Sequence, residues 1–149
     1  MALSTDWKEF IGLLNSKGVE YLLVGGHAVA FHSKPRMTGD IDFFLRRSQD
    51  NAERTIEALD DFGFSSLGIK AEDLLKADSV IQLGVEPGRI DLLTDLSGLS
   101  FEEAGAHRVE GKIDGVMVSV ISVADLSKNK RALARPQDLA DVEAIEGRS

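Results

Sequence analysis

The stretch Tyr21-Leu22-Leu23-Val24-Gly25-Gly26, followed by Asp40-Ile41-Asp42-Phe43-Phe44-Leu45, decides the fold. Each half contains a short apolar run, which predicts a buried strand. Gly25-Gly26 breaks the first run sharply, and we expect a short helix or turn from His27 to His32. The polar residues 33–39 then lead into the second run. The sequence therefore predicts two core strands joined by a turn and a polar loop.

Helical and strand patterns surround this pair on both sides. Trp7, Phe10, Ile11 and Leu14 form a single apolar stripe at helical spacing before it. After it we expect a helix, a hairpin, a further strand and two closing helices. The predicted fold is α/β (α+β), with a mixed sheet of about four to five strands flanked by helices. We expect one domain over residues 1–149, with the C-terminal helices of residues 123–147 packed on it.

The composition excludes several classes of function. The chain has 149 residues and no cysteine, which rules out disulfides, thiolate zinc sites and a cysteine nucleophile. Its 17 lysines and arginines against 25 aspartates and glutamates give a net charge of −8, which disfavours a protein that coats nucleic acid. No signal peptide and no apolar run of the roughly 20 residues needed to span a bilayer is recognisable. We therefore expect a cytoplasmic protein with no membrane partner.

Gly25-Gly26 follows a strand and precedes a predicted helix. Two glycines let backbone N–H groups approach a ligand closely, and a helix N-terminus attracts phosphate. The same pair is common in ordinary turns, and by itself it favours that simpler interpretation.

Asp40-Ile41-Asp42 places two carboxylates on one face of a strand, because successive strand residues alternate faces. Two such carboxylates repel each other unless a cation neutralises them, and oxygen ligands suit Mg²⁺ or Mn²⁺. Alternatively, Asp40 only ends the loop and Asp42 alone lies within the strand.

Asp91 is a third acidic residue within an apolar strand, in Arg89-Ile90-Asp91-Leu92-Leu93. A carboxylate in such a strand is rarely unpaired, and a salt bridge to Arg89 or Arg36 would satisfy it. If its strand lies beside that of Asp40 and Asp42, the three carboxylates converge. Such a triad can hold two metal ions that promote phosphoryl transfer.

Together these motifs resemble the nucleotidyltransferase superfamily, which has the polymerase-β-like fold. Its signature is an apolar strand, Gly-Gly or Gly-Ser, a spacer, Asp-x-Asp or Asp-x-Glu, and a later acid; here the spacer is 13 residues, 27 to 39. Val-Gly-Gly-His-Ala, Arg-Met-Thr-Gly-Asp-Ile-Asp at 36–42 and the tail at 126–142 resemble small prokaryotic members related to AbiEii-type toxins. The resemblance covers the chain from about Tyr21 onward.

The resemblance implies a role for each matching residue. Gly25 and Gly26 would cradle the nucleotide phosphates. Asp40 and Asp42 would bind Mg²⁺ or Mn²⁺, and Asp91 would complete the metal site and help to deprotonate the acceptor hydroxyl. Further nucleotide contacts would come from residues in the loop and the C-terminal helix, namely Arg36, Thr38 and Lys130. Arg36 and Thr38 could instead brace the loop, and Lys130 could be a solvated residue in a basic patch.

The activity implied is transfer of a nucleoside monophosphate from an NTP such as ATP to an acceptor hydroxyl, with release of pyrophosphate. The acceptor stays open among a small molecule, a protein and a tRNA end, and a homodimer or a partner protein could complete its binding site. Two other functions remain. One is a catalytically inactive module of the same fold that binds or regulates, for example in a toxin–antitoxin pair; the other is a phosphohydrolase that directs the same acids at water.

Overall fold

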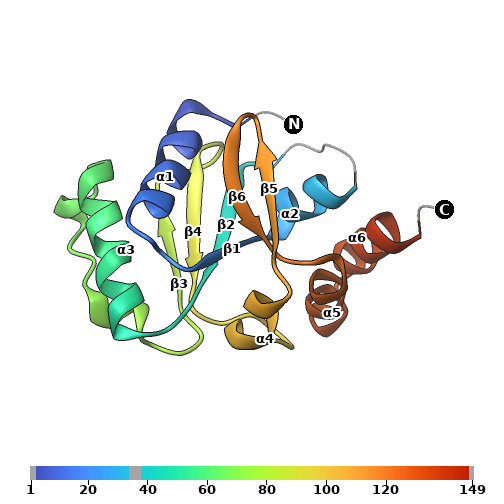
Figure 1. Ribbon diagram of the computed structural model, residues 1–149. Coiled ribbons are helices and arrows are strands. Elements are labelled where there is room, and N and C mark those ends of the chain that lie inside the picture. The colour runs from blue at the N-terminus through green and yellow to red at the C-terminus, as the bar shows by residue number, and fades with distance from the viewer. Residues whose placement is uncertain (1–2, 34–37, 148–149) are drawn as a thin grey trace.

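The computed structural model describes residues 3–33 and 38–147. Within these ranges one mixed sheet of six strands is surrounded by six α-helices (Figure 1). The strands are β1 (Tyr21–Val24), β2 (Asp40–Leu45), β3 (Val80–Leu83), β4 (Arg89–Leu93), β5 (Val109–Ile113) and β6 (Val116–Val120). The helices are α1 (Thr5–Ser16), α2 (Gly25–His32), α3 (Gln49–Phe62), α4 (Phe101–Ala106), α5 (Val123–Leu133) and α6 (Pro136–Glu146), with two 3₁₀ turns at Ser65–Leu67 and Ala71–Leu74.

The sheet has the strand order β3-β4-β2-β1-β6-β5. β2 lies inside it, antiparallel to β1 and parallel to β4, and β6 runs parallel to β1. The two edge strands pair antiparallel with their neighbours, β3 with β4 and β5 with β6. The α/β class and the mixed sheet are therefore confirmed.

The sheet contains more strands than the four to five expected, because the sequence pattern did not predict β5. This strand reads Val-Glu-Gly-Lys-Ile and is mostly exposed at the sheet edge, so it lacks the apolar alternation of a half-buried strand. The turn that joins it to β6 did carry a signal. Asp114 and Gly115 both have positive φ angles, 52° and 83°, as a tight Asp-Gly hairpin requires.

The two faces of β2 carry different side chains. On one face, Phe43 is fully buried and its ring lies 5.7 Å from that of Phe10 in α1. The ring of Phe10 also contacts the ring of Phe62 in α3. The other face carries Asp40 and Asp42, and α2 contacts this strand. Figure 1 shows α1 and α3 on one side of the sheet and α2, α5 and α6 on the other. The acidic face of β2 thus lies on the side of α2, α5 and α6.

Candidate active site

Three aspartates converge on neighbouring strands. β2 and β4 pair in parallel with Asp42 opposite Asp91, and Asp40 is opposite Arg89. One carboxylate oxygen from each aspartate lies within 4.8 Å of the other two, which is close enough to share a metal ion. The convergence expected from the sequence is therefore present, and Asp40 belongs to the strand rather than to the preceding loop.

Burial and mutual repulsion perturb these carboxyl groups. The pKa of Asp42 rises to about 7, first because the group is partly buried and so loses hydration, and then because Asp40 and Asp91 are negative and Asp91 shares a hydrogen bond with it. Burial also raises the pKa of Asp91, although Arg89 opposes that shift. A cation at this point would favour the charged form of all three groups. The donor set, three carboxylates around one position, fits Mg²⁺ or Mn²⁺.

Arg89 lies against the triad as a counter-charge within the chain. Its Nε donates to Asp91 Oδ1 at 2.9 Å, and its Nη2 donates to Asp40 Oδ2 at 2.8 Å and to Asp91 Oδ2 at 3.2 Å. The salt bridge between Asp91 and Arg89 is thus present together with the triad. The bond to Asp40 was not predicted from the sequence, although strand alternation already places residues 89 and 91 on one face. Arg36, the other candidate partner, lies outside the described residues.

Gly25 allows the turn after β1 to pass close to Asp42. Its φ angle is +69°, a left-handed backbone conformation that residues other than glycine rarely adopt. A Cβ atom at this position would overlap Asp42 Oδ2. Glycine is needed here both for the backbone conformation and for the position of the carboxylate. Gly26 follows in the first turn of α2, and both glycines line the cavity described next.

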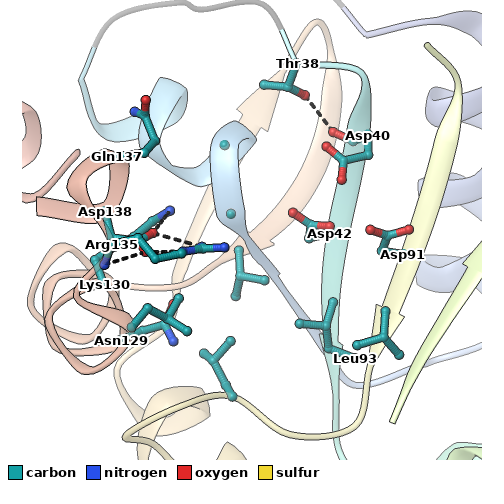
Figure 2. A pocket seen from close by; sticks show the side chains of 16 residues that line it. Thr38, Asp40, Asp42, Asp91, Leu93, Asn129, Lys130, Arg135, Gln137 and Asp138 are labelled. Carbon is teal, nitrogen blue, oxygen red and sulfur yellow. Dashed lines mark hydrogen bonds and ion pairs between the residues drawn. The ribbon is translucent and has the colours of Figure 1, made fainter. Parts of the chain in front are cut away.

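A cavity of about 440 Å³ lies above the triad, and small-molecule sites commonly have this size. The sheet side contributes the three aspartates, the two glycines and Thr38; the helical side contributes residues of α5 and α6 and of the link between them. Figure 2 shows the three aspartates on one wall and Lys130, Arg135 and Asp138 on the opposite wall. An apolar part of the lining comes from Val24, Val80, Leu93, Leu96 and Leu133.

The hydroxyl of Thr38 is engaged within the protein. It donates to the backbone oxygen of Asp40 at 2.6 Å and lies 3.1 Å from His27 Nδ1. Because the hydroxyl has one proton, the imidazole nitrogen is the donor in the second bond. Thr38 therefore braces the entry to β2, as one of the two interpretations of the sequence proposed, and it also lines the cavity.

The helical wall is built around buried ion pairs. The ammonium of Lys130 lies 3.2 Å from Asp138 Oδ1 and 3.1 Å from Asp141 Oδ2, and only 7% of its side chain is exposed. Both the side chain and the backbone N–H of Arg135, the N-cap residue of α6, donate to the carboxylate of Asp138. Hydrogen bonds from Arg135 and then from Lys130 hold the pKa of Asp138 down at about 2. Lys130 is thus a buried residue rather than a solvated one.

All the described residues expected at the site meet in this one cavity: Gly25, Gly26, Thr38, Asp40, Asp42, Asp91 and Lys130. Asn129, Gln137 and the apolar residues of the lining were not predicted to join them. These residues come from separate elements with no shared motif. Asn129 and Gln137 reach the cavity because α5 and α6 pack beside α2, and most of the apolar residues come from the sheet strands.

This mixed α/β fold fits a nucleotidyltransferase domain. The chain matches a family described as "Nucleotidyl transferase of unknown function (DUF2204)" over residues 3–147, and it belongs to that family. The superfamily resemblance is thereby confirmed, while the match makes no link to AbiEii-type toxins. A search of curated proteins found no match to the chain. No helix in the described part of the chain is long and apolar enough to cross a membrane.

The contact between Gly25 and Asp42 can be tested by a pair of glycine substitutions. Gly25→Ala introduces both a strained φ and the overlap with Asp42, whereas Gly68→Ala has nearly the same φ, +71°, with open space around the new methyl group. We expect Gly68→Ala to lower the free energy of unfolding by about 1–2 kcal/mol and Gly25→Ala to lower it by clearly more. Urea denaturation measures both, and equal losses would contradict the proposed overlap.

Asp138→Asn should destabilise the protein at pH 7 by about 3 kcal/mol, because Lys130 stays buried with one carboxylate fewer. The pKa of Asp138 is lowered on folding, so its contribution is complete above the unfolded-state value of 3.8 and is lost as the pH falls towards 2. The stability gap between wild type and variant should therefore narrow by about 1 kcal/mol at pH 3 and about 2 kcal/mol at pH 2.

Denaturation by urea between pH 7 and pH 2 measures this gap. Glu143→Gln, which changes an exposed carboxylate of the same helix, is the control and should leave stability within about 0.5 kcal/mol of wild type. A gap between wild type and Asp138→Asn that does not change with pH would refute the assignment.

Proposed function

We propose that this protein is a metal-dependent nucleotidyltransferase that transfers a nucleoside monophosphate from an NTP to an acceptor hydroxyl. The observation that carries the proposal is the convergence of Asp40, Asp42 and Asp91 in a cavity that also contains the Gly25-Gly26 turn. Membership of a nucleotidyl transferase family supports it. Asp40, Asp42 and Asp91 would hold Mg²⁺ or Mn²⁺, which would neutralise the triphosphate and polarise the reacting phosphorus centre.

The chain's own residues account for the remaining requirements of the reaction. Gly25 and Gly26 begin α2, where free backbone N–H groups and the helix dipole favour the phosphates. The acceptor oxygen forms a bond to the α-phosphorus, the bond from that phosphorus to the bridging oxygen breaks, and pyrophosphate leaves with the electron pair. Asp91 accepts the proton of the acceptor hydroxyl, and Arg89, which donates to both of its oxygens, holds the carboxylate in place.

The cavity also suggests how much of the chain takes part. The sheet and the α5–α6 pair both line it, which supports the proposal that residues 123–147 belong to the same functional unit as the sheet. Thr38 lies in this lining and remains a proposed contact of the nucleotide. Lys130 lines the cavity too, but its ammonium is shared between Asp138 and Asp141, so its part would be to shape the α5–α6 wall. The volume of about 440 Å³ is in the range of pockets that hold drug-sized ligands.

Incubation of the protein with each labelled NTP, Mg²⁺ and a cell lysate tests the activity. Transfer gives a labelled adduct that mass spectrometry identifies, whereas hydrolysis gives only nucleotide products. If no NTP is consumed and no heat of NTP binding is measured in the presence of Mg²⁺, the proposal fails in favour of an inactive module.

Asp42→Asn separates function from stability. We expect it to reduce nucleotide transfer by at least about 100-fold, since it removes one charge of the triad. In EDTA the same variant should be as stable as wild type or more so, because a partly buried charge between two like charges is removed. Transfer assays and urea denaturation measure these effects.

Asp50→Asn is the matched control. This carboxylate lies on α3, is exposed and pairs with Arg54, so its loss should leave transfer unchanged. Wild-type transfer by Asp42→Asn would refute the assignment of the triad.

A further inference from the structure

Arg135 and Lys130 both line the cavity on its helical wall, but their charged groups differ in exposure and in ion-pair partners. The ammonium of Lys130 is buried and shared between two carboxylates, Asp138 and Asp141. An anionic ligand that approached it would compete with both of them. The Arg135 side chain is 67% exposed, and within the described residues it has a single ion-pair partner, Asp138.

The hydrogen bonds of Arg135 leave one edge of its guanidinium uncovered. Nε donates to Asp138 Oδ2 at 2.5 Å, and Nη2 donates to Asp138 Oδ1 at 3.1 Å. A guanidinium has five N–H donors, so three remain beyond those that Asp138 receives. Its planar fork can bind two oxygens of a phosphate at once, which the ammonium of a lysine cannot do.

The backbone and the side chain of Arg135 are both held in a fixed position. Its backbone N–H also donates to Asp138 Oδ2, at 3.3 Å, and Pro136 fixes the backbone at the first residue of α6. Asp138 is fully buried, and its lowered pKa keeps it charged at neutral pH. One carboxylate therefore holds both the main chain and the side chain of Arg135. A side chain held in this way loses little conformational entropy when it binds a ligand.

We propose that Arg135 is the residue of the α5–α6 wall that binds an oligophosphate in this cavity, and that Asp138 is its positioning residue. The identification of this oligophosphate as the triphosphate of an NTP rests on the proposed function. The sheet wall presents carboxylates and the helical wall presents this open guanidinium. A phosphate chain between the two walls meets any bound cations on one side and Arg135 on the other.

Calorimetric titration with inorganic tripolyphosphate in the presence of Mg²⁺ tests the inference without needing an acceptor. We expect Arg135→Gln to raise the Kd for tripolyphosphate by about tenfold or more. Arg135→Lys keeps the charge and loses the fork, so it should raise the Kd by a smaller factor. The Kd for Mn²⁺ alone should stay unchanged in both variants, because the triad is on the opposite wall.

Arg131→Gln is the matched control. This arginine lies four residues earlier, within α5, is similarly exposed and pairs with Glu146, but it does not line the cavity. The Kd for tripolyphosphate should remain at the wild-type value in this variant. Circular dichroism shows whether each variant is folded, and Arg135→Lys provides the comparison if Arg135→Gln is not.

The inference is overturned if the Arg135→Gln variant binds tripolyphosphate with the wild-type Kd. If Arg135→Gln does not fold, a wild-type Kd in Arg135→Lys has the same meaning. The inference also fails if the wild-type protein does not bind tripolyphosphate. The proposed function fails separately. If wild-type protein binds tripolyphosphate through Arg135 but transfers no nucleotide, the inference stands and the proposed function falls. If the Arg135→Gln variant transfers nucleotide with an unchanged KM for the NTP, the inference falls and the proposed function stands.

Discussion

The parallel pairing of β2 with β4 is the constraint on which the site depends. Its register sets Asp42 opposite Asp91 and Asp40 opposite Arg89, so the triad and its counter-charge are fixed by the backbone hydrogen bonds of the sheet. A shift of one residue in the pairing register of β2 would turn the carboxylates into the core and Phe43 out of it. Because Phe43 is fully buried against Phe10, the hydrophobic core opposes such a shift. The packing on one face of β2 thereby holds the chemistry of the other face in place.

Holding three carboxylates together has a cost in free energy, and two features of the chain reduce it. Arg89 bridges Asp40 and Asp91, and partial protonation of Asp42 near neutral pH relieves the repulsion further. Gly25 adds a different condition, since a side chain at that position would displace Asp42. The glycine of the motif thus serves the carboxylate as well as any phosphate. In the sequence alone, these two roles of Gly25 cannot be told apart.

The sequence was most informative where local pattern and tertiary structure coincide. Asp42 and Asp91 could be placed on strands because their apolar neighbours run together, and the Gly-Gly turn marked the end of β1. The place of Asp40, in the strand or at the end of the loop, stayed open until the structure put it in β2. Two features were not predicted from the sequence, for different reasons. β5 has too few buried residues to produce a pattern, and its Asp114-Gly115 turn was the signal to read. The burial of Lys130 depends on how α5 packs against α6, which brings Asp138 and Asp141 to it and which no spacing along α5 reveals.

The net charge of −8 takes on a different meaning once the charges are located. Asp138 and Asp141 neutralise a buried lysine, and Asp40 and Asp91 share Arg89, so several acidic residues of the surplus act within the structure rather than at its surface. On the sheet wall three aspartates outnumber one arginine, which leaves that wall negative without a further cation. On the helical wall the two positive charges, of Lys130 and Arg135, are balanced by two carboxylates. The two cations differ in their exposure to solvent, since Lys130 is buried and Arg135 is exposed. An anionic ligand is thus repelled by one wall until cations bind there, while the other wall can accept it through a single fixed guanidinium, so binding of the cation and of the anion should reinforce each other.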